Sequence, residues 1–328
     1  MRFAVLGAGA IGAYVGAALA RGGADVTLIA RGPHLAAMRR DGVRVLSPRG
    51  DFSARPEATD DIGAVAGADV VFVALKAYSL PEIAPRLGEL LAPGAAVIWA
   101  QNGIPWWYFQ SIGLPPAAAA GGRAGLESVD PGGVIARSIA PEHNVGCVVF
   151  CSTDVIEPGL IRHIEGTRFT IGEPDGSVTE RCKRISAAFT VGGLKAPVEP
   201  RLRDQIWLKL IGNVAFNPIT ALTRATLGEL GTMPEMLALL RAVFGECAQV
   251  AERLGITFPV SLDRRLEAGI AVGGHRTSML QDLEAGKRLE LDCMTGAVTE
   301  LAGLLGVDVP HIRTVHACAA LLDRLNRA

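Results

Sequence analysis

The sequence lacks the features that mark nucleic-acid-binding, membrane-spanning and disulfide-stabilised proteins. Its 32 basic and 33 acidic side chains give a formal net charge of -1, so the charge does not predict a nucleic-acid partner. No segment has the length and apolarity needed to cross a bilayer, so no membrane partner is expected. We therefore expect a small molecule as the partner.

Cysteine pairs are also missing. The six cysteines form no C-x-x-C pattern, and in a chain of 328 residues they are typical of buried thiols in a reducing compartment. They are Cys147, Cys151, Cys182, Cys247, Cys293 and Cys318. The expected location is the cytoplasm.

The sequence contains no pattern for a metal site or an activated nucleophile. Its six histidines offer no H-E-x-x-H pair or other close ligand spacing, so no metal is predicted. The G-x-S-x-G pattern of serine hydrolases is absent. Cys147 and Cys151 are evenly spaced on a predicted strand, which favours core packing over nucleophilic catalysis.

The length predicts two domains, because 328 residues exceed one ordinary compact core. Strand-like runs alternate with helical stretches up to about residue 110, the pattern of a parallel sheet with helices on both faces. These runs are residues 3–6, 26–29, 43–46, 70–75, 96–99 and 147–151. Residues 69–75 are apolar without alternation, so they predict a central strand. The predicted fold class is α/β, with an N-terminal Rossmann-type parallel sheet domain.

The second half of the chain changes character. Turn residues and two tryptophans predict an insertion at about residues 105–141, a lid or a dimer contact. Three short strands, a helix at 179–191 and a strand at 194–198 complete a domain of residues 1–199. The short strands are 144–151, 160–163 and 167–172. Residues 200–328 predict an all-α domain for substrate binding or dimerisation, with helices at 203–216, 234–254, 259–271, 278–283 and 291–305.

The amino terminus imitates a secretory signal, because Met1-Arg2 precedes an uncharged run that ends in small residues at Ala20. Three spaced glycines are unfavourable in the helical core of a signal, and a strand-like segment at residues 24–29 follows. We therefore interpret the run as the first strand and helix of the folded domain.

That strand and helix enclose a G-x-G-x-x-G loop, which in this context predicts a dinucleotide site. The loop consists of Gly7, Ala8, Gly9, Ala10, Ile11 and Gly12. Gly7 permits a tight turn, Gly9 lets the backbone approach a pyrophosphate, and Gly12 lets the helix pack closely. The helix N-terminus would offer free N–H groups to the phosphates.

The second strand predicts which dinucleotide binds. NAD-binding units usually end this strand with an acidic residue, whereas here Ala30 leads to Arg31. A guanidinium matches a phosphate dianion, so NADPH is predicted with Arg31 on the 2′-phosphate, and a solvated surface arginine is the alternative. Lys76 and Asn102 follow two strand ends and are expected to reach the same cofactor crevice.

A polar face on one helix of the second domain suggests chemistry. Lys209 stands among large apolar residues, and Asn213 and Asn217 follow at four-residue intervals. Partial desolvation would lower the pKa of the lysine and suit it to protonate a carbonyl oxygen, while the amides could bind a carboxylate or hydroxyl. Pro218 is expected to bend this helix. The alternative is a solvated stripe on an amphipathic helix.

Together these residues resemble the ketopantoate reductase family, the 2-dehydropantoate 2-reductases that reduce ketopantoate with NADPH on the way to pantothenate. The resemblance covers nearly the whole chain, and its most specific part is the run from Trp207 to Leu222 with the lysine and both asparagines. The other segments are the glycine loop, Leu75-Lys76-Ala77-Tyr78, Gln101-Asn102-Gly103, Ser278-Met279-Leu280-Gln281-Asp282 and Leu289-Glu290-Leu291-Asp292.

The resemblance implies a role for each matching residue. Lys209 would be the general acid that protonates the carbonyl oxygen as hydride arrives from the nicotinamide, and Glu290 would orient this lysine or hold the substrate hydroxyl. Substrate oxygens would be bound by Asn102, Asn213, Asn217 and Ser278. The cofactor would be bound by the glycine loop together with Arg31, Lys76 and Asn102.

Several alternatives stay open. Ser278 and Gln281 fit a capping box, so the serine could simply begin a helix, and Glu290 could be a surface charge. The chain departs from the family at His275, where the resemblance suggests asparagine, and in its long segment at 106–141. A reductase of another small 2-keto acid and a non-catalytic NADPH-binding sensor are the alternative functions. A helical second domain would also allow a homodimer.

Overall fold

The computed structural model describes residues 1–116 and 125–327, which form two compact units. The first, the sheet unit, comprises Met1–Gln101, Trp107–Ile112 and Gly133–Leu202. The second, the helical unit, comprises Asn102–Trp106, Gly113–Gly132 and Arg203–Ala328. The chain thus changes unit repeatedly within the stretch predicted as an insertion, of which residues 117–124 lie outside the described residues.

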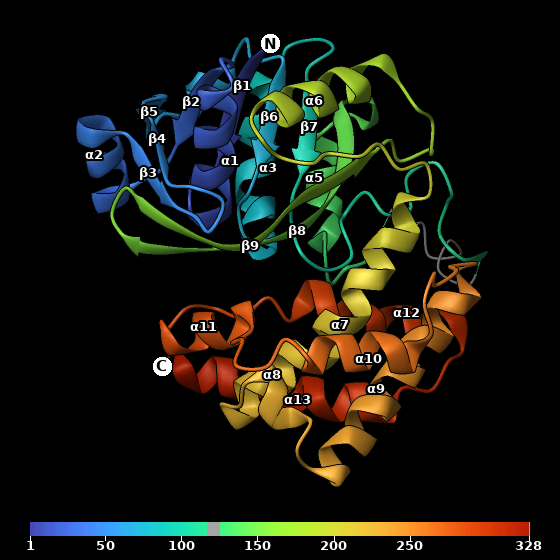
Figure 1. Cartoon of the computed structure of the whole chain (residues 1–328). Helices are drawn as coiled ribbons and strands as arrows, with labels where there is room; N and C mark the ends of the chain where they lie inside the picture. The colour runs from blue at the N-terminus through green and yellow to red at the C-terminus, as the bar shows by residue number, and fades with distance from the viewer. Residues whose placement is uncertain (117–124, 328) are drawn as a thin grey trace. The chain divides into compact units, whose positions relative to one another are not determined.

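The described residues of the sheet unit form one nine-stranded sheet with the order β4-β3-β9-β8-β7-β6-β1-β2-β5 (Figure 1). The strands are β1 (Arg2–Leu6), β2 (Asp25–Ile29), β3 (Val43–Leu46), β4 (Phe52–Ala54), β5 (Glu57–Thr59), β6 (Val70–Val73), β7 (Ala96–Trp99), β8 (Asn144–Glu157) and β9 (Leu160–Gly172). Strands β5, β2, β1, β6, β7 and β8 pair in parallel. The predicted α/β class is confirmed, and β6 is central and fully buried as expected.

The sheet departs from the prediction beyond β7. The three short strands predicted between residues 144 and 172 are two long strands, β8 and β9, which pair antiparallel as one hairpin. Their outer halves are partly exposed, so these polar stretches read as turns in the sequence although backbone pairing continues through them. The strand predicted at 194–198 is wrong, because only isolated bridges form there, from Lys195 to Arg168 and from Val198 to Ile171.

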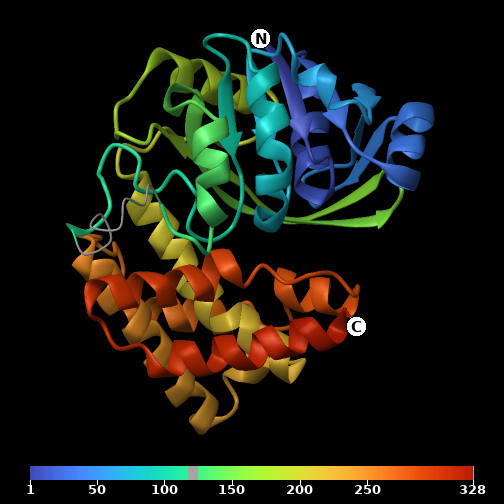
Figure 2. The ribbon, with the colours of Figure 1, turned by 180° about the vertical axis from the view of Figure 1, so that it is seen from behind.

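Helices cover both faces of the sheet, with α1 and α6 on one face and α3 and α5 on the other (Figures 1 and 2). They are α1 (Ala10–Arg21), α2 (Gly32–Asp41), α3 (Leu80–Leu90), α5 (Val134–Ser138) and α6 (Glu180–Val191). The Thr179 side chain caps α6 at the predicted start. Phe189 of α6 packs against Phe3 and Phe169 of the sheet, with ring centroids 6.5 and 5.9 Å apart. Burial of these rings fixes α6 on the strands.

The helical unit confirms most of the predicted helices and shifts their ends. In the described part of the chain, its α-helices include α7 (Leu202–Thr223), α8 (Leu227–Leu230), α9 (Pro234–Arg253), α10 (Leu262–Ile270), α11 (Ser278–Glu284), α12 (Ala297–Leu305) and α13 (Pro310–Asn326). Helix α7 runs past Pro218 and does not end at residue 216. The predicted helix 291–305 begins as a π-helix, Asp292–Gly296, and α13 was not predicted.

The structure also shows how exposed the cysteines are and whether any described helix could span a membrane. Of the six cysteines, Cys147, Cys182, Cys247 and Cys293 are buried, but Cys151 is partly exposed and Cys318 is exposed on α13, so the expectation of uniformly buried thiols is wrong. Among the described residues, no helix combines the length and the hydropathy required to traverse a membrane.

Candidate active site

The glycine loop joins β1 to α1 and has the geometry that its sequence predicts. Gly7 has φ +95°, a conformation that favours glycine, and its N–H, like that of Ala8, is donated to the Ile29 carbonyl of β2. A Cβ on Gly12 would lie 2.3 Å from the Gly7 carbonyl oxygen, so Gly12 is required for the turn itself. A Cβ on Gly9 would meet no protein atom within 4 Å. The open space above Gly9 is where a ligand could approach the backbone.

The first turn of α1 is suited to an anion. Its N-cap, Gly9, provides no side-chain hydrogen bond, and the turn contains no acidic residue. Within the described chain, the N–H groups of Ala10, Ile11 and Gly12 have no protein acceptor. Free N–H groups at a helix N-terminus, with the positive end of the helix dipole, bind phosphate. These residues therefore fit the pyrophosphate of a dinucleotide.

Arg31, Lys76 and His34 lie around this loop. Arg31 is the exposed N-cap of α2, two residues after Ile29, and its side chain has no hydrogen-bond partner among the described residues. Lys76 directly follows Leu75, whose side chain would lie 2.8 Å from a Cβ on Gly7. Burial lowers the pKa of His34, although the nearby Ala8 carbonyl favours the protonated ring.

The predicted catalytic lysine contacts a predicted site residue of the same unit. The Lys209 Nζ donates a hydrogen bond of 2.7 Å to Oδ1 of Asn102, 107 positions earlier in the chain. Lys209 is partly buried and its flanking residue Trp207 is fully buried, which excludes the alternative of a wholly solvated stripe. A lysine with a fixed amide partner in a restricted solvent environment can present one N–H to a carbonyl oxygen.

The backbone after Asn102 is held by the π-helix. The Ile104 N–H donates to the Cys293 carbonyl at 2.7 Å, and a Cβ on Gly103 would lie only 2.2 Å from that same oxygen. Gly103 also has φ +85°, so a larger residue is excluded both by strain and by contact. The Gln101 side chain, just before, donates to the Val73 and Leu75 carbonyls.

Asn213 and Asn217 continue along α7 from Lys209. Asn213 is partly buried, and its amide has no partner among the described residues. Asn217 is 6% exposed, and its Nδ2 donates to the Met294 sulfur at 3.7 Å. Both amides therefore keep hydrogen-bonding capacity for a ligand.

The start of α11 corrects the capping prediction. The N-cap is Thr277, whose hydroxyl accepts from the Leu280 N–H and lies 2.6 Å from the Thr220 hydroxyl of α7. Ser278 is the first helical residue, and its exposed hydroxyl is free of the capping task. The Thr220 contact favours Thr277, a tertiary effect that the local pattern does not contain.

Glu290 is not a surface charge. Glu290 is only 6% exposed and lies two residues before the π-helix. A buried carboxylate requires partners, and a π-helix within a helical segment often accompanies a functional site. Sequence reasoning did not predict the π-helix or the contact between Thr220 and Thr277. Gly103 and Thr220 lie in segments that carry the resemblance, but no role was assigned to them.

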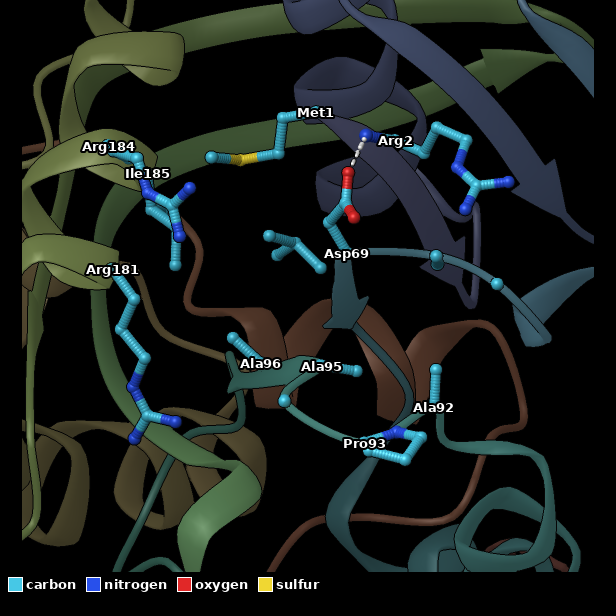
Figure 3. A pocket seen from close by; sticks show the side chains of 14 residues that line it. Met1, Arg2, Asp69, Ala92, Pro93, Ala95, Ala96, Arg181, Arg184 and Ile185 are labelled. Carbon is cyan, nitrogen blue, oxygen red and sulfur yellow. Dashed lines mark hydrogen bonds between the residues drawn. The ribbon is translucent and has the colours of Figure 1, made fainter.

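The sheet unit also contains a cavity of about 440 Å³ that is separate from the predicted site residues (Figure 3). It is lined by the amino ends of β1, β6 and β7 and by α6, with Arg2, Asp69 and Arg184 among its charged residues. Cofactors bind parallel sheets at the carboxyl ends of the strands, where the glycine loop follows β1. The cavity contains none of the predicted site residues.

Comparisons with known proteins agree with the geometry. Residues 3–105 match the family model "Ketopantoate reductase PanE/ApbA", and residues 201–323 match "Ketopantoate reductase PanE/ApbA C terminal". A 2-dehydropantoate 2-reductase from Mesorhizobium japonicum is 41% identical over 326 residues, which cover 99% of this chain and 98% of the relative. Another from Halobacterium salinarum is 32% identical, with 99% of each chain covered.

Solved structures show the same fold over the full length. A structure from Ralstonia solanacearum MolK2 has a TM-score of 0.90 at 36% identity and covers 99% of this chain and 98% of that one. The PanE/ApbA family ketopantoate reductase from Ralstonia eutropha JMP134 has a TM-score of 0.85 at 28% identity, with 100% of both chains covered. With both family models matched and full-length relatives above 30% identity, the chain belongs to the ketopantoate reductase family.

Proposed function

We propose that this chain reduces 2-dehydropantoate (ketopantoate) to pantoate with NADPH, a step of pantothenate biosynthesis. The observation that carries the proposal is the 2.7 Å hydrogen bond from Lys209 to Asn102, which holds an amine beside the residues that the family resemblance assigns to the substrate. The relatives named 2-dehydropantoate 2-reductase support the substrate.

In this mechanism the protein supplies the proton and the orientation. When bound, NADPH supplies the hydride to the keto carbon. The Lys209 ammonium donates a proton to the carbonyl oxygen, which becomes the hydroxyl of the product, and the lysine regains its proton from water. Asn102 orients Lys209, and Glu290 orients the same lysine or accepts from the substrate hydroxyl. Negative charge developing on the oxygen is stabilised by the ammonium.

The remaining site residues bind the substrate or the cofactor. Asn213, Asn217 and Ser278 would donate to substrate oxygens, because each has hydrogen-bonding capacity that the described protein leaves unused. The free N–H groups of the glycine loop would hold the pyrophosphate, Arg31 the 2′-phosphate, and Lys76 and Asn102 other parts of NADPH.

Three broader assignments belong to the same proposal. We propose residues 1–199 as the NADP-binding domain and residues 200–328 as the substrate domain. We also propose a cytoplasmic location, because six cysteines without a C-x-x-C pair are typical of a reducing compartment. A homodimer is proposed because Leu321 and Leu325 expose apolar surface on α13, at 48% and 64%.

The test is NADPH oxidation with ketopantoate, compared with pyruvate, 2-ketoisovalerate and oxaloacetate. We expect kcat/KM to be highest for ketopantoate. Preference for another of these acids would assign a different 2-keto acid, which the partly buried His275 beside the α11 cap would favour. Tight NADPH binding without oxidation on any acid would leave the non-catalytic sensor as the function.

A further inference from the structure

The last turn of α13 contains a buried acid, Asp323, that no proposed catalytic step uses. Asp323 is 6% exposed, and its Oδ1 accepts a 2.8 Å hydrogen bond from the Leu289 N–H, 34 positions earlier. Its Oδ2 pairs with Arg327 at 2.8 Å. A carboxylate is costly to bury, and here the hydrogen bond to Oδ1 and the ion pair to Oδ2 offset that cost.

The same turn makes a second contact with the proposed site region. Asn326 donates from Nδ2 to the Leu283 carbonyl at 3.0 Å, near the end of α11, whose first residue is Ser278. Figures 1 and 2 show the C-terminal end of α13 beside α11. The end of α13 thus holds both α11 and the segment that precedes Glu290.

The segment held by Asp323 connects to three proposed site residues, which makes its position important. Leu289 precedes Glu290 directly. Four residues later, the Cys293 carbonyl accepts from Ile104, which fixes the backbone next to Asn102. The sulfur of Met294 accepts from Asn217. A shift at Leu289 would therefore be transmitted to Glu290 and to the π-helix that supports Asn102 and Asn217.

We infer that Asp323 is a positioning residue of the active site, which acts through the Leu289 N–H to fix Glu290 and the π-helix. This inference rests on the proposed roles of Glu290 and Asn102. The acceptor oxygen does the positioning, whereas the ion pair with the half-exposed Arg327 neutralises the buried charge. Outer residues of this kind hold catalytic groups within the small tolerance that proton transfer allows.

Three variants separate these contributions. Asp323→Ala removes the acceptor, and we expect kcat with ketopantoate to fall about 10- to 100-fold while the Kd for NADPH is unchanged. Asp323→Asn keeps an acceptor oxygen and should restore most of kcat. Arg327→Ala removes the ion pair and a 3.3 Å hydrogen bond from Arg327 to the Asp323 backbone carbonyl but leaves the Oδ1 contact with Leu289, so kcat should stay within about twofold. Hydrogen–deuterium exchange of the peptide containing Leu289 should rise in Asp323→Ala alone.

The outcomes separate this inference from the proposed function. An active wild type together with an equally active Asp323→Ala variant would overturn the inference alone. Equal losses in the Ala and Asn variants, with unaltered exchange at Leu289, would also overturn it, because the acceptor would then be irrelevant. A wild type that oxidises NADPH with none of the four keto acids would instead overturn the proposed function itself.

Discussion

Lys209 is the side chain whose removal should separate catalysis from cofactor binding. Its Nζ is the proposed proton donor and is fixed on Asn102, whereas the glycine loop belongs to the sheet unit. We expect Lys209→Ala to lower kcat about 10²- to 10⁴-fold, the usual contribution of a positioned general acid. The Kd for NADPH should change little. The measurements are steady-state NADPH oxidation and fluorescence titration of the cofactor.

Lys287→Ala is the matched control, because Lys287 is an exposed lysine of the same unit. It should retain wild-type kcat. If Lys209→Ala turned over at the wild-type rate, the lysine could not be the acid, and the polar face of α7 would have only a binding or structural role.

Arg31 should decide the preference for NADPH over NADH. Its exposed side chain makes no hydrogen bond or ion pair within 4 Å among the described residues, although its charge helps to lower the pKa of Asp60, whose direct partner is Arg39. The guanidinium therefore keeps its donors for a phosphate. Charge-assisted hydrogen bonds contribute about 1.5 to 3 kcal/mol, so Arg31→Ala should weaken NADPH binding about 10- to 100-fold. NADH binding should be unaffected. Arg40→Ala is the control on the same helix, since Arg40 pairs with Asp41 at 2.6 Å. Equal weakening of both cofactors would contradict the assignment.

The local geometry of a residue was predictable where its own backbone requirements determine it. The glycine loop could be predicted because a positive φ at Gly7 and a close approach at Gly12 are requirements of the turn itself. The capping residue of α11 could not, because Thr277 and Ser278 both fit the cap by sequence. The contact with Thr220, 57 positions away, decides between them.

At the scale of elements, α13 depends on a residue of another helix. The buried Glu246 of α9 accepts hydrogen bonds from the His311 and Ile312 N–H groups, at 3.0 and 2.9 Å, in the first turn of α13. Its replacement by alanine would leave these donors without partners. We expect Glu246→Ala to lower the free energy of unfolding of the helical unit by about 1 to 3 kcal/mol.

Urea unfolding followed by circular dichroism measures this effect. Glu252→Ala removes an exposed carboxylate of the same helix and should have little effect. If both variants unfolded at the same urea midpoint, Glu246 would not stabilise α13. Water would then replace the Glu246 carboxylate as the acceptor of the His311 and Ile312 N–H groups.

This dependence also explains which elements the sequence could not predict. Long periodic helices such as α9 have their signal within the element, and α9 was predicted to within one residue at its end. Strand β4 has only three residues, and it forms because it pairs with β3. Strand β3 in turn pairs with β9, whose residues lie more than 100 positions later in the chain. Such pairings depend on the whole sheet and leave little trace in a short window.

At the scale of the whole molecule, two partly buried histidines should make stability depend on pH. Burial lowers the pKa of His34 in the sheet unit and of His316 in the helical unit below the ordinary 6.5, with nearby Asp292 opposing the shift at His316. At Glu173, burial alone would raise the pKa, but hydrogen bonds from Arg181 and Thr179 lower it below the ordinary 4.5. The histidines and the carboxylate therefore act in separate pH ranges.

The sign follows from proton binding. Well above pH 6.5 both histidines are neutral in the folded and unfolded states, so their contribution is complete. As the pH falls below 6.5 the unfolded chain binds protons first, so stability decreases until the folded-state pKa values are reached. The limiting slope is about 1.4 kcal/mol per pH unit for each histidine, reduced here because both rings are partly solvated. Glu173 contributes a further loss only below pH 4.5.

We expect the thermal stability of the wild type to fall between pH 6.5 and 5. His34→Gln and His316→Gln should each make this fall smaller, and the double variant should show the smallest fall. Glutamine keeps hydrogen-bonding capacity without titrating in this range, so the comparison isolates the proton rather than the packing. Calorimetric scans at closely spaced pH values measure it, and Glu173→Gln should alter only the most acidic part of the curve. Parallel curves for the wild type and both histidine variants would mean that the rings are hydrated enough to titrate equally in the folded and unfolded chain.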